Sequence, residues 1–178
     1  MSPRRRLAAL ALALAAGACS RDKAEAERAV RAYDEAVIQA YRTRDLSKLK
    51  EVATEKEWGK VLTLVDLKTG SRLVLESELQ SLEVAGVTRP GPGQLVVRTR
   101  ERWRYYDRPL DPGKPQGQVF VADMTLEYQF VRERGGPWKM DAARTLSNDY
   151  LEPKGFELDP GHGRSHGAPE GAQESGSR

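Results

Sequence analysis

The stretch from Gln94 to Asp107 constrains the fold of this chain most strongly, because its residues alternate between two kinds along its whole length. Successive side chains of a β-strand point to opposite faces of a sheet. One face of this stretch would be mostly apolar, with Leu95, Val97, Thr99, Glu101, Trp103 and Tyr105. The other would be strongly basic, with Val96, Arg98, Arg100, Arg102, Arg104 and Tyr106. The pattern predicts a long, bent strand whose apolar face is covered by helices formed from the preceding segment.

The preceding segment has helical periodicity. In Asp22–Arg42 the residues Val30, Tyr33, Val37, Ala40 and Tyr41 form one stripe, and the charged residues, Asp34 among them, are expected largely elsewhere. Asp45 is a candidate cap for a short second helix with Leu46, Leu49 and Val52. Thr54-x-x-Glu57 is a candidate capping box for a third helix that ends near Gly70.

From Arg72 onward the apolar period changes to two, which indicates strands. The first strand changes phase between Leu79 and Leu82, so we expect a β-bulge near Gln80–Ser81. A Pro/Gly turn at Arg89–Gly93 leads into Gln94–Asp107. A loop at Arg108–Gly117, a strand at Gln118–Glu133, a hairpin turn at Gly135–Gly136 and a last strand ending near Leu146 follow. Residues 152–178 lack the apolar side chains needed to offset ordering entropy and are expected to be disordered.

Three helices followed by four strands predict an α+β domain, with N-terminal helices packed on one face of a bent four-stranded antiparallel meander sheet. A bent sheet around a long helix resembles the cone-shaped nuclear-transport-factor-2-like fold. Within that superfamily the chain is most similar to the C-terminal domain of plastid-division J-domain-like proteins. The residues that carry this resemblance are Leu46–Leu49, Glu101–Asp107, Tyr128–Arg132 and Trp138–Asp141, within Ala24–Leu146. The motifs are loose and imply a fold rather than an activity.

The amino end reads as a secretory signal. Arg4–Arg6 form a positive n-region, and Leu7–Ala16 is an apolar stretch of ten residues, too short to span a bilayer, which needs roughly 20. Gly17, Ala18 and Cys19 resemble a bacterial lipobox, in which the cysteine becomes lipidated, although Ala16 stands where that motif prefers Leu. Ala16-Gly17-Ala18 also satisfies the rule for ordinary secretion with cleavage at the same bond.

The cysteine count favours lipidation. Cys19 is the single cysteine of the chain, so no internal disulfide can form, and an exposed lone thiol is a liability in an oxidising compartment. Ser20, which follows it, favours the outer membrane by resemblance to enterobacterial sorting. We therefore divide the chain into a signal peptide (1–18), a lipid-anchored tether (19–23), an α+β domain (24–151) and a tail (152–178).

The charge balance argues against nucleic acid as a partner. The formal net charge is +3, but without Arg4–Arg6 the number of Lys and Arg falls from 29 to 26, equal to the number of Asp and Glu. No nucleic-acid motif is present in the sequence. His162 and His166 have a helical metal-ligand spacing, but they lie in the Gly/Pro-rich tail, so we expect no metal site.

Three groups of residues are candidate sites. Arg98, Arg100, Arg102 and Arg104 could bind an anionic partner, or could form a cross-strand ladder with Glu76, Glu78, Asp123 and Glu127, worth roughly 0.2–1 kcal/mol a pair. An aromatic set could line a ligand pocket or simply pack the core: Trp58, Trp103, Tyr105, Tyr128 and Trp138. Glu101 is the one acid in phase with the inner face and a weak catalytic candidate. With no acid or histidine partner visible, we expect it to have a structural role or to lie at the rim, where it could meet water.

The sequence favours a lipid-anchored periplasmic protein whose domain is a non-catalytic module for binding a protein or peptide of the cell envelope, without a cofactor. The alternative is a small-molecule-binding or isomerase/dehydratase-like enzyme that uses a cone pocket around Glu101, since some members of the superfamily have such activities. An open polar-mouthed pocket would favour the alternative, and a filled core would favour partner binding.

Overall fold

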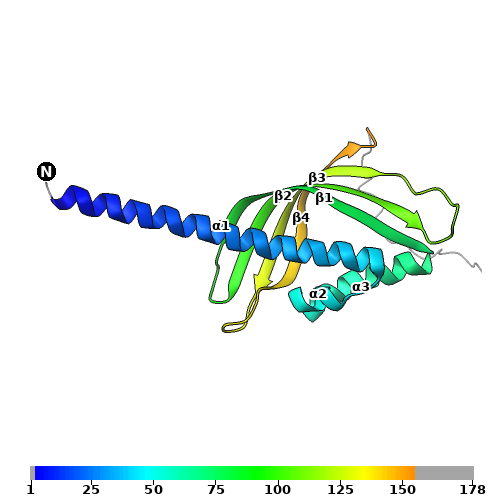
Figure 1. Ribbon diagram of the computed structural model, residues 1–178, viewed down its shortest axis with the longest axis horizontal. Helices are drawn as coiled ribbons and strands as arrows, with labels where there is room; N and C mark the ends of the chain where they lie inside the picture. Colours follow the sequence, from blue (N-terminus) through cyan, green and yellow to red (C-terminus); the bar gives the residue numbers. More distant parts are fainter. Residues whose placement is uncertain (1–2, 155–178) are drawn as a thin grey trace, which may run out of the picture.

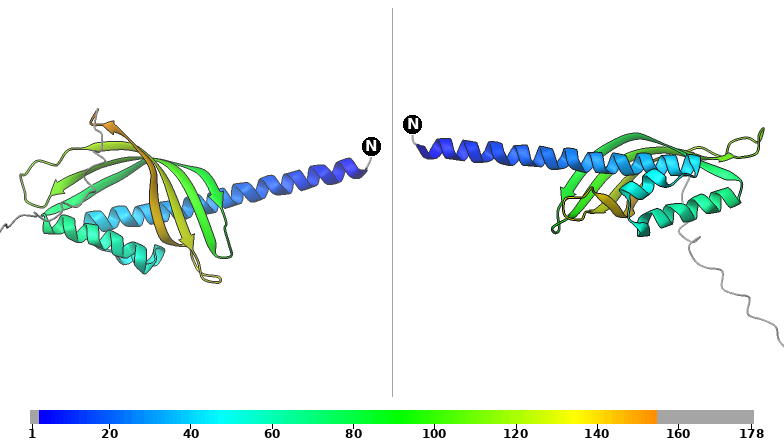
Figure 2. Two further views of the ribbon diagram at one scale, coloured as in Figure 1. Left: turned by 180° about the vertical axis from the view of Figure 1, so that it is seen from behind. Right: turned by 60° about the horizontal axis from the view of Figure 1, so that its bottom comes forward.

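The computed structural model describes residues 3–154, with side chains from Arg21 onward. Its elements are α1 (Pro3–Thr43), α2 (Ser47–Val52), α3 (Glu55–Gly70), β1 (Leu73–Thr88), β2 (Gln94–Pro109), β3 (Phe120–Val131) and β4 (Lys139–Glu152). The strands form one antiparallel sheet in the order β1-β2-β3-β4. The sheet arches over the three helices, which lie on its concave side (Figure 1, Figure 2). The predicted α+β class and the bent four-stranded meander are thus confirmed.

Helix α1 packs under the sheet through small and medium apolar residues spaced three or four apart. Ala26, Val30, Tyr33, Ala36 and Ala40 are buried on this face. The helix begins at Pro3 instead of near Asp22, because the Ala- and Leu-rich segment before Asp22 has high helix propensity, and it projects past the sheet (Figure 1). None of the helices in the described part of the chain is both long and apolar enough to cross a membrane.

The two short helices are joined to their surroundings by different polar contacts. The N-cap position of α2 is Leu46 and not Asp45 as predicted, but the Asp45 carboxylate accepts a hydrogen bond from the Ser47 amide, the first of the helix, at 2.9 Å. The predicted capping box at Thr54 is wrong. Its hydroxyl donates to Asp141 Oδ1 in β4 at 3.1 Å, and its amide donates to the Met140 carbonyl at 2.8 Å. Tertiary contact with β4 has replaced the local cap, so the start of α3 is attached directly to the sheet.

The predicted bulge in β1 is confirmed. Leu79 pairs with Trp103 and Ser81 with Arg102, so the register shifts between them. A second shift follows between Val84 and Gly86. The first shift brings Leu82 back to the face that Leu79 occupies, which keeps the apolar residues of β1 toward the helices while the strand bends.

The last strand is longer than predicted. It continues beyond Leu146 to Glu152, where the disordered tail was expected to begin. The added residues pair with the first half of β3, for example Tyr150 with Ala122 and Ser147 with Thr125. Without them the backbone groups on that side of β3 would have no strand partner. Residues 155–178, with both histidines, lie outside the described residues.

The core lies between the concave face and the helices. Its largest fully buried side chains include Leu49 from α2, Leu95 and Val97 from β2, Phe130 from β3 and Met140 from β4. A parallel bridge between Ala53 and Met140 draws the loop after α2 against β4. The three helices are therefore packed on the sheet as one unit.

The turn between β1 and β2 depends on a glycine in the left-handed region. Gly93 has a φ of 69°, and a Cβ at this position would lie 2.6 Å from the Arg132 carbonyl oxygen. Gly135 has a φ of 76° with no atom within 4 Å of such a Cβ. We expect Gly135→Ala to lower the free energy of unfolding by about 1–2 kcal/mol, the usual left-handed penalty. Gly93→Ala should lower it further because of the clash.

Urea unfolding of both variants and the wild type measures this difference. Equal losses in the two variants would show that the contact between the turn and Arg132 is not tight.

Candidate functional site: a buried acid pair and the adjoining groove

Glu101 lies inside the core and not at the rim. Only 2% of its surface is exposed, so the expected alternative of a rim position that meets water is wrong. Its carboxylate accepts hydrogen bonds from the Thr99 hydroxyl (2.6 Å), the Trp103 indole N–H (2.6 Å) and the Tyr128 hydroxyl (2.9 Å). Burial raises the pKa of Glu101 above its usual value, although these three donors oppose the shift.

A second acid, Asp34 of α1, faces Glu101 across the same tyrosine. Asp34 is 3% exposed, and the Tyr128 hydroxyl lies 3.3 Å from its Oδ1. Burial, followed by the nearby charge of Glu101, raises the pKa of Asp34 well above its usual value. Tyr128 is therefore shared between an acid of the helix and an acid of the sheet.

This pair adjoins a further buried polar contact. The Tyr33 hydroxyl donates to Glu57 Oε1 at 2.9 Å, and Lys60 Nζ donates to Glu57 Oε2 at 2.7 Å. The rings of Tyr33 and Tyr128 meet edge to face, with centroids 6.2 Å apart. We call the five residues that link α1, α3, β2 and β3 in this way the polar seam: Tyr33, Asp34, Glu57, Glu101 and Tyr128.

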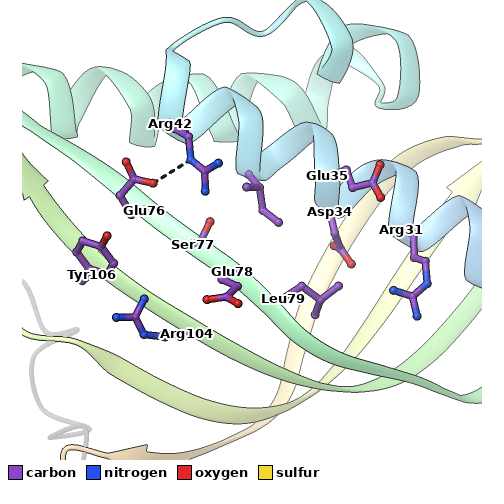
Figure 3. A pocket seen from close by; sticks show the side chains of 11 residues that line it. Arg31, Asp34, Glu35, Arg42, Glu76, Ser77, Glu78, Leu79, Arg104 and Tyr106 are labelled. Atoms are coloured by element: carbon purple, nitrogen blue, oxygen red, sulfur yellow. Dashed lines mark hydrogen bonds and ion pairs between the residues drawn. The ribbon is translucent and has the colours of Figure 1, made fainter.

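One residue of the polar seam, Asp34, also lines a groove between α1 and the edge strand β1 (Figure 3). The groove has a volume of about 480 Å³. Two buried side-chain atoms in the described part of the chain have no hydrogen-bond partner, Asp34 Oδ2 and Ser77 Oγ, and both residues line this groove. Its other lining residues are Arg31, Glu35, Ile38, Arg42, Glu76, Glu78, Leu79, Arg104 and Tyr106.

The arginines that line the groove already have partners. Arg42 and Arg108 donate to the two carboxylate oxygens of Glu76 at 2.9 and 2.8 Å. Burial disfavours ionisation of Glu76, but these hydrogen bonds outweigh it and lower its pKa. Arg31 pairs with Glu27 at 2.9 Å, and the Arg104 guanidinium lies 5.1 Å from the centre of the Tyr106 ring.

The basic stripe on β2 makes cross-strand ion pairs with two of the four acids predicted, Asp123 and Glu127. Arg102 donates to both oxygens of Asp123 at 2.7 and 2.9 Å, and Arg98 donates to Glu127 at 2.8 Å. Arg100 lies 3.9 Å from Glu83, which the prediction did not name. Glu76, a predicted partner, instead binds Arg42 and Arg108. The stripe is thus largely an ion-pair ladder.

The aromatic candidates have separate surroundings. Trp103 and Tyr128 bind Glu101, as described above. Trp58 lies under the Lys50 ammonium at 4.8 Å. Tyr105 stacks on Phe120 with centroids 5.6 Å apart. Trp138 donates to Glu25 Oε1 at 2.8 Å and lies beside Arg132. These aromatic side chains therefore contact different neighbours in different parts of the domain.

Two further predicted features lie where the structure gives no side chain. The Cys19 side chain and the tail histidines are outside the described residues. Among the described residues no group of three or more potential ligands is brought together to hold a metal.

Comparisons with known proteins bear on the fold alone. No family model matches the chain, and no curated protein matches it. The crystal structure of the intermembrane-space region of the chloroplast protein ARC6 has a TM-score of 0.61 at 19% identity, and covers 71% of this chain and 97% of that one. A conserved protein from Planctomyces limnophilus covers 67% of this chain and 97% of its own, with a TM-score of 0.43 at 16% identity. The chain therefore has an α+β fold related to that of the ARC6 region.

Sequence reasoning missed Asp34. It lies four residues after Val30 and three before Val37, so the helical period itself places it on the apolar stripe. An acid at such a position indicates a buried partner or a site. The prediction that Asp34 lies away from the apolar stripe with the other charged residues is therefore wrong.

The raised pKa of Asp34 predicts a pH-dependent difference in stability. The folded state holds the proton more tightly than the unfolded state, so Asp34 lowers the free energy of unfolding progressively as pH rises from its unfolded pKa, about 4, to its folded pKa. Asparagine does not titrate. Urea unfolding should therefore show that Asp34→Asn gains stability relative to the wild type as pH rises from about 4 to 8.

Glu25→Gln is the control of opposite sign. The hydrogen bond from Trp138 and the neighbouring arginines lower the pKa of Glu25 below its usual value of 4.5. This variant should therefore lose stability relative to the wild type as pH rises toward 4.5, and the difference should stay constant from about pH 5 to 8. A difference for Asp34→Asn that does not change with pH would contradict the buried acid pair.

Proposed function

We propose that this chain is a lipid-anchored protein of the bacterial cell envelope, at the outer membrane facing the periplasm, whose domain binds a protein or peptide without catalysis. Arg4–Arg6, the apolar Leu7–Ala16 and the single cysteine at position 19 support the anchor. The likeness to the ARC6 region and the bent sheet around a long helix support membership of the nuclear-transport-factor-2-like superfamily.

The observation that carries the binding role is the contrast between the filled core and the groove. Beneath the sheet, Leu95, Val97 and Phe130 are fully buried, and Glu101 has three donors. Space for a partner lies instead at the surface, between α1 and β1. A groove bordered by an edge strand suits an extended peptide, which can add its own backbone hydrogen bonds to the strand.

A second candidate is a small-molecule enzyme. It is favoured by a hollow of about 410 Å³ at the middle of the sheet, which Leu82, Glu101 and Met124 border with others. In this case Glu101 and Asp34 would be the acid–base pair. Turnover of a ligand that is abolished in Glu101→Gln would favour the enzyme over the binding module.

The anchor is tested by labelled fatty acid. We expect incorporation into the wild-type chain and none into Cys19→Ser, because thioether lipidation needs the thiol. Membrane fractionation should show Cys19→Ser released with the soluble periplasmic proteins. Equal labelling of both forms, or none of the wild type, rules the anchor out.

The binding role is tested by photo-crosslinking in intact cells. A photoreactive residue at Leu79, in the groove, should give one dominant crosslinked envelope protein. The matched control is Leu146, which is 41% exposed on β4 and does not line the groove. Capture of the same products from both positions, or of none, would contradict a partner in the groove.

A further inference from the structure

Resting on the proposed binding function, we infer that the groove between α1 and β1 takes an extended peptide segment that bears a lysine or arginine. The basic side chain would bind the Asp34 carboxylate, and the peptide main chain would hydrogen-bond with the Ser77 hydroxyl. The groove, its two partnerless polar atoms and its unequal charges each point to this class of ligand.

The partnerless atoms are the first argument. A buried polar atom without a hydrogen bond costs about 1–3 kcal/mol, so native proteins leave few of them. Asp34 Oδ2 and Ser77 Oγ are the two such atoms in the part of the chain that the structure describes, and both belong to residues lining one groove. Asp34 is almost fully buried and points from α1 into the space between helix and strand (Figure 3). A ligand with polar groups would satisfy both atoms.

The placement of the two atoms favours an extended ligand. Asp34 lies opposite Leu79, whereas Ser77 lies further along β1 toward the Arg42–Glu76 pair (Figure 3). β1 is an edge strand, so the backbone groups on its outer side have no strand partner within the sheet. A peptide laid along β1 meets that edge, passes Ser77 and reaches Asp34 with a side chain.

The charges select a basic side chain. Glu35 and Glu78 line the groove and make no ion pair or hydrogen bond within residues 21–154. Asp34 also has the charge of Glu101 behind it. The lining arginines, in contrast, are engaged by Glu27, Glu76 and the Tyr106 ring. Arg31 attracts the Asp34 carboxylate, but Asp34, Glu35 and Glu78 make no ion pair within residues 21–154. An ammonium or guanidinium group donates hydrogen bonds and accepts none, so it suits these carboxylates.

The test is an NMR titration of the full chain in detergent with three capped tripeptides. They carry lysine, norleucine or glutamate between two glycines, and butylamine serves as the probe without a main chain. We expect the lysine peptide to give saturable shifts at Asp34 and Ser77, with a dissociation constant of roughly 1 mM. The norleucine and glutamate peptides should bind at least about tenfold more weakly, a difference of about 1.4 kcal/mol.

Variants separate the two contacts. Asp34→Asn should weaken the lysine peptide and butylamine alike. Ser77→Ala should weaken the peptide severalfold and leave butylamine unchanged. Asp123→Asn, which alters a paired acid outside the groove, should change neither. Each variant is titrated with both the lysine peptide and butylamine. A general loss of folding in Ser77→Ala would weaken the binding of both probes and would also be visible in the NMR spectrum of the variant.

Equal binding of the norleucine and lysine peptides, preferred binding of the glutamate peptide, or no saturable shift would each overturn the inference. The absence of a saturable shift would mean that water alone hydrogen-bonds to Asp34 Oδ2 and Ser77 Oγ. If these peptides fail but Leu79 still captures a partner in cells, the inference falls and the proposed function stands. If the lysine peptide binds but Leu79 captures nothing, the groove chemistry stands and the envelope partner does not.

Discussion

The hydroxyl of Tyr128 is the contact on which the rest of the structure depends. It lies between Glu101 of β2 and Asp34 of α1, and both acids are almost completely buried. Burying a carboxylate without partners costs several kcal/mol, so the sheet surrounds Glu101 with three donors. Asp34 receives only the longer contact from Tyr128. The helix thus meets the sheet through two acids, of which Glu101 has three hydrogen-bond donors and Asp34 has one.

The groove lies between two points at which α1 is attached to the rest of the domain. Toward one end Glu25 accepts hydrogen bonds from Arg89 and Trp138. Toward the other end Arg42 donates a hydrogen bond to Glu76 of β1. Between these two points the helix runs beside β1, and Asp34 is one of the residues that line the groove between them. The same residue therefore joins the interior packing to the surface where a ligand would bind.

The sheet could be predicted from the sequence because the alternation in β2 is strong and its partners repeat it. The phase change in β1 even located the bulge between Leu79 and Ser81. Local rules failed where tertiary contacts replaced them. Thr54 turns to Asp141 instead of capping α3, and β4 runs to Glu152 to pair with β3. The candidate site was half predicted. The alternation of β2 placed Glu101 on the inner face. Its partner Asp34 lies on α1, far away in the sequence, and local sequence patterns do not indicate which residue of a helix will contact a given residue of a sheet.

A double-mutant cycle on Asp34 and Glu101 tests the central claim most directly. The free energies of unfolding of the wild type, Asp34→Asn, Glu101→Gln and the double variant are measured in urea at about pH 8, where unperturbed carboxyls are ionised. Each single change relieves the repulsion between the two acids, so the account predicts a coupling energy of at least about 0.5 kcal/mol, with the double variant gaining less than the sum of the singles. Additivity within about 0.3 kcal/mol would show that the two acids do not interact, and would contradict the account.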